Sequence, residues 1–377
     1  MHLSPIQLVE LIHAAPRKVV LAVAGGGSRA IGWLTDVPGA SKTLLEAVVP
    51  YSAKAMNELL GGPTDAACSV ETARAMAMAA FLRGRKYDDN IPGPVGIGCT
   101  AALASDRPKR GDHRLYIAAQ TENATATWSL TLEKGRRSRA EEEQLVARLL
   151  LNVIAKFCKL GEQLDLQLLT PEQLGQEHVD ISVTAASQSW EDLLLGKIEL
   201  ASAAGDDQPP TAVFPGAFNP LHQGHRRMIE IAEEELGTPV AVELSILNVD
   251  KPPLDYACIE QRLSQFPAER PVWLTRAARF RRKARLFPGA TFIVGADTLR
   301  RIVDPQYYDD NVATCRAAVA EIVELGCRFL VFGRNSGEGF QGMSDMQLPD
   351  ELAKVCRQVP AERFRDDISS TSIRRGQ

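Results

Sequence analysis

The chain has 377 residues, of which 45% are hydrophobic and 24% are charged, and its formal net charge is −4. This length excludes a single small binding module and predicts two or three domains, each large enough to bury a core. The charge balance argues against bulk nucleic acid as a partner, and no apolar run approaches the roughly 18–20 residues that cross a bilayer.

The N-terminal segment MHLSPIQLVELIHAAPRK has an acidic residue and a proline where a secretory signal has a cationic start and an uninterrupted apolar core. We therefore expect a cytoplasmic protein. The seven cysteines are odd in number and scattered, with no CxxC and no Cys/His pair at zinc spacing. We expect reduced core thiols and no protein-bound metal.

Residues 1–160 carry the pattern of one α/β domain. The sequence predicts a helix over 5–15 and then a buried strand over 19–24, which runs directly into a Gly-Gly-Gly-Ser turn. Helices are expected over 41–60, 70–83 and 141–157, and a β-hairpin is expected over 115–132.

Residues 161–208 give weaker signals, and we interpret them as a connecting segment. It contains a strand-like stretch over 179–184, a short helix around Trp190 and a polar linker, AAGDDQPP, over 203–210. Beyond it, strands and helices alternate as in a parallel sheet, which predicts a second domain over 209–377. Its strands are expected over 211–214, 241–247, 291–294 and 328–332, with helices over 222–237 and 315–325 and a long helical stretch before 291.

The segment TAVFPGAFNPLHQGH, residues 211–225, joins a short strand, a tight turn and the start of a helix. A helix N-terminus offers unpaired N–H donors and about half a positive charge, which suits a polyphosphate. His222 and His225 lie one helical turn apart, and Gly216 and Gly224 allow close backbone approach. A lone histidine here would be a core or capping residue, whereas the pair in this context predicts a phosphate site.

The closing segment DISSTSIRR, residues 367–375, places hydroxyl groups three or four positions before guanidinium groups. Such an arrangement at a helix start forms a second anion cradle. A capped terminal helix with a solvated basic face is the alternative. The first motif favours the cradle.

These two segments resemble the two signatures of the nucleotidylyltransferase superfamily, especially of the nicotinate and nicotinamide mononucleotide adenylyltransferases. Between them, ILNVDKPP (246–253) resembles the family's lysine-bearing loop and FIVGADTL (292–299) resembles its GxDxL strand end. FLVFGR (329–334) resembles the strand that ends in a phosphate-facing arginine. The resemblance implies a Rossmann-like parallel sheet and transfer of an adenylyl group from ATP to a pyridine mononucleotide, as in NAD biosynthesis, with release of pyrophosphate.

The resemblance also implies roles for individual residues. The implied catalytic residues are His222, His225 and Arg374. The implied ATP and phosphate contacts are Gly216, Ala217, Phe218, Gly224, Arg334, Ser370 and Thr371. Lys251 would screen the attacking phosphate and Asp297 would bind a ribose hydroxyl or orient the nucleotide, while Mg²⁺ would accompany ATP.

One position departs from the family. Bacterial nicotinate enzymes carry a tryptophan beyond the GxD aspartate that contacts the pyridine ring, and here that spacing gives Pro305. Tyr307, just after it, is either a stacking partner for the pyridine or an ordinary core or surface aromatic.

The first half resembles the C-terminal domain of competence/damage-inducible proteins of the CinA type, some of which are nicotinamide mononucleotide deamidases. The matching elements are LTDVPGAS (34–41), VVPYS (48–52) and SVETARAMA (69–77). The family's ESCTGG element, which holds its nucleophilic serine, corresponds here to AGGGS (24–28), and its TGxAGP loop corresponds to CTAALA (99–104). Ser28, Tyr51 and Lys54 are the candidate residues, but the displaced serine favours a retained fold with lost or altered catalysis.

Other functions stay open at this point. They are nucleotidyl transfer to another small phosphate, a bifunctional deamidase and adenylyltransferase, and a non-catalytic nucleotide sensor. The sequence does not set the oligomeric state, and a homodimer is one candidate.

Overall fold

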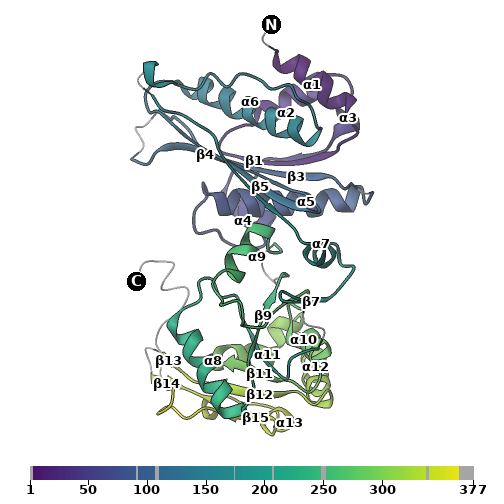
Figure 1. Cartoon of the computed structure of the whole chain (residues 1–377), viewed down its shortest axis with the longest axis vertical. Helices are drawn as coiled ribbons and strands as arrows, with labels where there is room; N and C mark the ends of the chain where they lie inside the picture. Colours follow the sequence, from purple (N-terminus) through teal and green to yellow (C-terminus); the bar gives the residue numbers. More distant parts are fainter. Residues whose placement is uncertain are drawn as a thin grey trace. The chain divides into compact units, whose positions relative to one another are not determined.

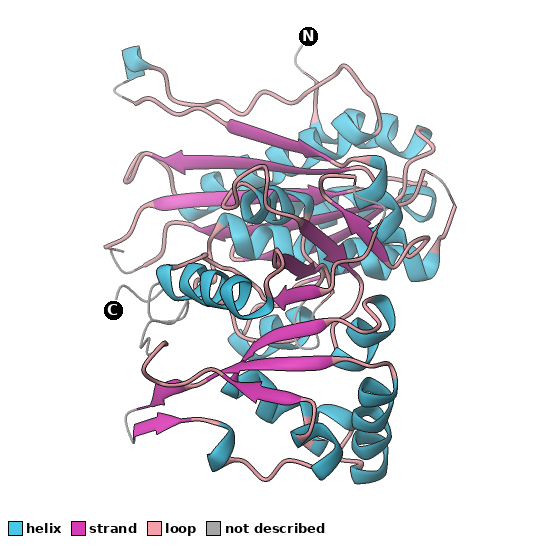
Figure 2. Ribbon diagram, turned by 60° about the horizontal axis from the view of Figure 1, so that its bottom comes forward, coloured by secondary structure: helices cyan, strands magenta, loops and turns pink. Residues whose placement is uncertain are grey.

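A computed structural model describes residues 3–90, 92–106, 110–173, 175–205, 208–247, 252–336 and 339–364 of the chain. The chain divides into two compact units, Met1–Glu191 with Asp250–Ala257, and Asp192–Val249 with Cys258–Gln377. In each unit helices pack against a sheet (Figure 1, Figure 2), which confirms the predicted α/β class.

The first unit is built on a mixed sheet with the strand order β2-β1-β3-β4-β5-β6, in which β2, β1 and β3 are parallel and the later neighbours are antiparallel. The strands are β1 (Val19–Ala24), β2 (Leu44–Val48), β3 (Val95–Ala102), β4 (His113–Gln120), β5 (Ala124–Leu132) and β6 (Asp180–Ala185). The helices are α1 (Pro5–Ala14), α2 (Arg29–Asp36), α3 (Ala40–Thr43), α4 (Ala53–Leu60), α5 (Val70–Tyr87), α6 (Arg139–Phe157) and the 3₁₀ turn Pro171–Gln173.

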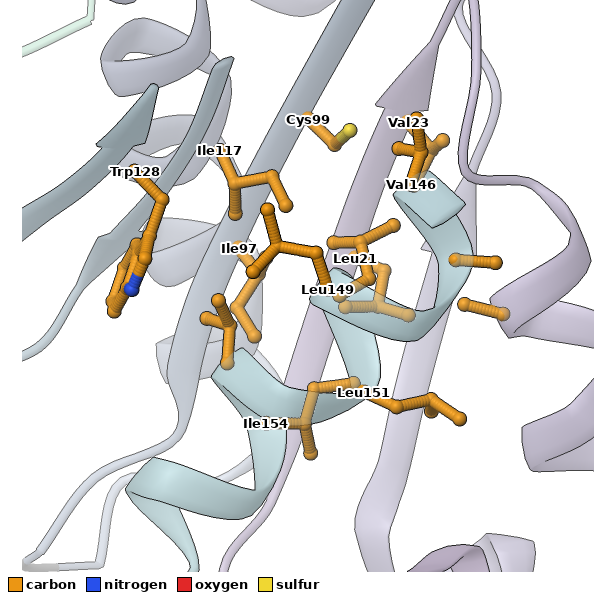
Figure 3. Close-up of a cluster of buried hydrophobic side chains, with 14 of the residues drawn as sticks. Leu21, Val23, Ile97, Cys99, Ile117, Trp128, Val146, Leu149, Leu151 and Ile154 are labelled. Atoms are coloured by element: carbon orange, nitrogen blue, oxygen red, sulfur yellow. The ribbon is translucent and has the colours of Figure 1, made fainter. Parts of the chain in front are cut away.

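The core of the first unit lies between the sheet and α6. Figure 3 shows Leu149 and Ile154 of α6 among Ile97 and Ile117 from the strands, and all four side chains are buried. Helices α1 and α2 pack beside α6, whereas α5 covers the opposite face of the sheet (Figure 1). The apolar stripe that the sequence predicts on α6 is therefore its core-facing side.

Two expectations for this unit are wrong. The helix expected over 41–60 is α3, then strand β2, then α4, because the segment 44–48 pairs in parallel with β1 and Pro50 follows it. Strand β3 was not expected, because glycines alternate along it. A Cβ at Gly96 would lie 2.1 Å from the Phe81 nitrogen of α5, so these glycines let the helix approach the sheet.

The second unit contains a sheet with the order β15-β12-β11-β8-β9-β10-β7, parallel throughout except for β7. Its strands are β7 (Leu200–Ser202), β8 (Ala212–Pro215), β9 (Ala241–Ser245), β10 (Val272–Thr275), β11 (Thr291–Gly295), β12 (Arg328–Phe332) and β15 (Cys356–Gln358), with a separate hairpin of β13 (Arg334–Ser336) and β14 (Gly339–Gln341). Its helices are α8 (Gln223–Leu236), α10 (Phe280–Leu286), α11 (Ala296–Ile302), α12 (Val312–Glu324), α13 (Asp350–Ala353) and the 3₁₀ turns Pro305–Tyr308 and Met343–Asp345. Two further helices, α7 (Gln188–Leu195) and α9 (Tyr256–Leu263), run from one unit into the other.

Two sequence-based expectations differ from this topology. The long helical stretch expected before residue 291 is wrong, because β10 lies between α9 and α10 and pairs with β9. Residues 161–208, expected as a connecting segment, contribute β6 to the first sheet and β7 to the second. Within the described ranges, no helix combines the length and apolarity needed to cross a bilayer.

The order of strands in the second sheet predicts where a ligand binds. From β8 the chain moves to β9 and β10 on one side, and then returns to β11 and β12 on the other side of β8. The connections leaving β8 and β11 therefore separate at their carboxyl ends. Such a reversal in an open parallel sheet leaves a crevice in which ligands bind.

Candidate active site

A cavity of about 310 Å³ lies at this reversal point. Its walls come from the residues that follow β8, the first turn of α8, and the ends of β11 and β12. The lining residues are Phe214, Pro215, Gly216, Ala217, Phe218, His222, Gly224, His225, Met228, Gly295, Ala296, Asp297, Thr298, Phe332, Gly333 and Phe364. Seven residues that the sequence predicts for ATP or substrate are thus brought to one cavity: Gly216, Ala217, Phe218, His222, Gly224, His225 and Asp297.

The two histidines form a stacked pair at the start of α8. His222 is the N-cap residue in extended conformation, and its backbone N–H donates to Nδ1 of His225 at 3.3 Å. Their rings lie 3.7 Å apart between centroids and 22° from parallel. Because Nδ1 of His225 accepts this hydrogen bond, its Nε2 carries the proton of the neutral ring and is the nitrogen available to a ligand.

The surroundings of His225 keep it neutral. Burial, together with the charge of His222, lowers the pKa of His225 to about 3. The rings of Phe214 and Phe218 meet the imidazole edge-on, with centroids 5.9 and 5.0 Å away. In this state the imidazole of His225 offers a hydrogen-bond donor but carries no full positive charge.

The loop after β8 owes its shape to Phe218. This residue is 1% exposed, it adopts a left-handed backbone with φ of 43°, and its ring covers Gly216. A Cβ at Gly216 would lie 2.5 Å from Cζ of Phe218. The N–H of Gly216 donates to the carbonyl of Glu243 on β9 at 3.0 Å, which ties the loop to the sheet.

Asp297 lies in the first turn of α11, where the sequence places it at a strand's carboxyl end. Its side chain is 48% exposed, and one carboxylate oxygen lies 3.9 Å from Nη1 of Arg300. It is the only carboxylate among the described residues that line the cavity. Within the same ranges, no group of three or more His, Cys, Asp or Glu side chains could hold a metal ion.

The remaining predicted residues have separate positions. Tyr307 packs against the cluster of Tyr308, Cys315 and Ala318, and it is not among the described residues that line the cavity. Arg334 begins β13, directly after the cavity residue Gly333. Four predicted residues lie outside the described ranges, so their roles stay predictions: Lys251, Ser370, Thr371 and Arg374.

Several cavity residues were not predicted. Phe332 and Phe364 form one wall, with ring centroids 5.0 Å apart and the rings at 85°. Met228 and Thr298 also line the cavity and were not predicted as site residues, although Thr298 belongs to the 292–299 motif. In the sequence, an aromatic residue at the end of an apolar strand has the same pattern as a core residue, so no local signal distinguishes them.

The glycine turn of the first unit is already occupied by a protein carboxylate. Glu143 of α6 accepts hydrogen bonds from the N–H of Gly27 at 2.7 Å and the N–H of Arg29 at 3.0 Å. The Ser28 hydroxyl also donates to this carboxylate, at 3.2 Å. These are the donors that would face a bound phosphate, so Glu143 takes the place that a phosphate would need.

The same turn of α6 holds the loop that follows β3. Glu142 accepts the N–H of Ala104 at 2.6 Å and contacts Nδ1 of His113 at 2.7 Å. Arg139 donates to the carbonyls of Gly25 and Ala104, at 2.9 and 3.1 Å. The turn after β1 and the loop after β3 are therefore both held by hydrogen bonds with the first turns of α6.

The other candidates in the first unit face the solvent. Tyr51 is 74% exposed, and Lys54 is exposed on the first turn of α4. The hydrogen bond that the structure gives the Ser28 hydroxyl goes to Glu143 rather than to either of them.

Comparison with solved structures finds proteins of the CinA superfamily. A competence/damage inducible protein CihA from Agrobacterium tumefaciens is 20% identical, with a TM-score of 0.35, over 41% of this chain and 97% of that chain. A CinA superfamily protein from Klebsiella pneumoniae is 10% identical, with a TM-score of 0.34, over 42% and 99% of the two chains. A competence or damage-inducible protein from Enterobacter asburiae is 12% identical, with a TM-score of 0.33, over 42% and 98%.

A search of curated proteins finds no match to the chain. A family model described as cytidylyltransferase-like matches residues 213–376. This range holds the whole cavity, both histidines and the closing motif, and it confirms the recognition of the second half from its sequence. The second half of the chain is therefore a cytidylyltransferase-like domain, of the nucleotidylyltransferase type that carries the HxGH motif.

Proposed function

We propose that the second unit transfers an adenylyl group from ATP to a pyridine mononucleotide, either nicotinate or nicotinamide mononucleotide, and releases pyrophosphate. The observation that carries this proposal is the stacked pair His222 and His225 at the start of α8, inside the cavity at the strand reversal. The cavity volume of about 310 Å³ is in the range of small-molecule sites.

The reaction joins two anions. The phosphate of the mononucleotide attacks the α-phosphorus of ATP in line with the leaving pyrophosphate, so no covalent enzyme intermediate is needed. The protein has to align the two groups and stabilise the charge that moves to the leaving oxygens. The Nε2–H of His225, the imidazole of His222 and the N-terminus of α8 are the donors that do this.

The substrate assignment depends on the segments that resemble the pyridine-nucleotide enzymes. Asp297 lies just after the carboxyl end of β11, and its half-exposed carboxylate is proposed to accept a ribose hydroxyl or to orient the nucleotide. The resemblance of the first unit to proteins that include nicotinamide mononucleotide deamidases independently favours the same substrate class.

ATP would enter as its magnesium complex. Asp297 is a single half-exposed carboxylate among the described lining residues, which fits an ion carried by the phosphates better than one held by the protein. The magnesium supplies charge neutralisation of the triphosphate. Arg334, Lys251, Ser370, Thr371 and Arg374 are proposed as the further phosphate contacts.

We propose that the first unit has lost deamidase activity. Two amides of the glycine turn and the Ser28 hydroxyl donate hydrogen bonds to Glu143. The turn therefore has a structural role, which is to hold α6 against the end of β1. A hydrolytic nucleophile needs a base and a place for the oxyanion, and here the nearby donors are engaged by a carboxylate.

The test measures pyrophosphate release by the full chain. Each of ATP and CTP is paired with nicotinate mononucleotide, nicotinamide mononucleotide, phosphopantetheine and a sugar phosphate, and the products are identified by mass spectrometry. We expect a dinucleotide product from ATP and a pyridine mononucleotide. Release only with CTP, or only with a non-pyridine phosphate, would replace the substrate assignment while keeping nucleotidyl transfer.

A further inference from the structure

Helix α9, together with the residues just beyond it, contacts the loop between β8 and α8 in the second unit. Its first residue, Tyr256, belongs to the first compact unit, and the helix continues from Cys258 in the second unit. The family motifs do not include this helix, and nothing in the proposed chemistry uses it.

At the C-terminal end, Gln265, just beyond the helix, holds the cavity loop with both ends of its amide. Oε1 of Gln265 accepts the N–H of Leu221 at 2.7 Å, and Nε2 donates to the carbonyl of Phe218 at 3.0 Å. Arg262 on the last turn donates to the carbonyl of Ala217 at 2.7 Å. The ring of Phe266 also meets the ring of Phe218 edge-on, with centroids 5.3 Å apart.

These contacts hold residues 217–221, which surround the two histidines. Phe218 covers Gly216 and contacts the imidazole of His225, and Leu221 directly precedes His222. A carboxamide that donates to one residue of a loop and accepts from another fixes the distance between those two residues. Gln265 therefore sets the position of both the Phe218 ring and the start of α8.

We infer that Gln265 and Arg262 are positioning residues for the 217–222 loop. The effect on turnover rests on the proposed function, whereas the effect on the loop itself does not.

The first test replaces Gln265 by Met, which keeps the length of the side chain and removes both hydrogen bonds. We expect kcat to fall about 10- to 100-fold, as for a small misplacement of groups around the reacting atoms, with a smaller change in KM for the mononucleotide. The Gln265→Glu variant keeps the acceptor for Leu221 and should recover part of the loss. The matched control is Gln261→Met, on an exposed position of the same helix, which should leave kcat unchanged.

A second readout does not depend on the reaction. The pKa of His225 is low because of burial, with Phe218 against its ring, so a displaced Phe218 should raise it. Histidine NMR of the full chain should show the pKa of His225 moving toward its ordinary value of about 6.5 in Gln265→Met but not in Gln261→Met. An unchanged titration overturns the positioning role, even if the wild-type protein is inactive with every proposed substrate and the proposed function fails.

Discussion

His225 combines two roles that can be separated by substitution. Its Nδ1 accepts the N–H of His222 and so caps α8, whereas its Nε2 is available to the ligand. Asparagine retains an acceptor near the position of Nδ1 and lacks Nε2. In His225→Asn we therefore expect turnover to fall by about two orders of magnitude or more, since one preorganised donor contributes about 2.7–4 kcal/mol to the transition state.

The measurement is pyrophosphate release, with thermal unfolding followed on the same samples. His222→Asn should lose turnover to a similar extent. The control is His178→Asn, on a side chain that is 69% exposed in the first unit. Near-normal turnover in either cavity variant would remove that histidine from the proposed chemistry.

The lowered pKa of His225 also makes stability depend on pH. Below about pH 6.5 the unfolded chain binds a proton at this imidazole, whereas the folded chain does not until the pH approaches about 3. The free energy of unfolding therefore falls as the pH falls through this window. Urea denaturation should show that wild type loses about 2 kcal/mol more than His225→Asn between pH 7 and 5, from about 1.4 kcal/mol per unit. Equal losses in the two proteins would mean that His225 is not kept neutral.

The loop between β8 and α8 depends on the absence of a side chain at Gly216. An alanine Cβ would lie 2.5 Å from Cζ and 2.6 Å from Cε2 of Phe218, whose ring is enclosed by His225 and Phe266. We expect Gly216→Ala to lower stability by about 1–3 kcal/mol and turnover by at least about tenfold, because the ring must move. Gly32→Ala is the control, since a Cβ there has no neighbour within 4 Å. Crystals of Gly216→Ala with an unmoved Phe218 ring would contradict the argument.

How much the sequence predicts depends on whether the signal is local. The strand, turn and paired histidines of residues 211–225 lie on one continuous segment, so their geometry and their shared cavity were predictable. Strand β3 was missed because its glycines make room for α5, a partner that the strand's own pattern does not show. Gln265 was missed for the same reason, since its two hydrogen bonds to the cavity loop reach residues more than forty positions away.

At Ser28 the sequence predicts the local turn correctly but does not show what the turn binds. A glycine turn after a buried strand is typical of a phosphate loop, and the structure does place Gly27 and Ser28 in such a turn. What the sequence could not show is that Glu143, more than a hundred residues later, fills it. The α/β class and the family of the second half were predictable, whereas the use of each loop depended on contacts distant in sequence.

The product that the full chain makes from nicotinamide mononucleotide depends on whether the first unit is catalytic. If only the second unit is catalytic, the amide group stays on the pyridine, and the product with ATP is the amide dinucleotide. We expect pyrophosphate release without ammonia release, and the same result for Ser28→Ala, because the Ser28 hydroxyl and the amides of Gly27 and Arg29 are engaged by Glu143.

The measurement follows ammonia and pyrophosphate in one reaction and identifies the dinucleotide by mass. Glu143→Gln gives an independent control. The amide NH₂ group of glutamine would face the N–H and O–H donors of the turn, which the carboxylate accepts in the wild type. It should lower the free energy of unfolding by about 1–3 kcal/mol without starting ammonia release. Ammonia release by the wild type that disappears in Ser28→Ala would show instead that both units are enzymes, and that Glu143 serves Ser28 as its base rather than closing the turn.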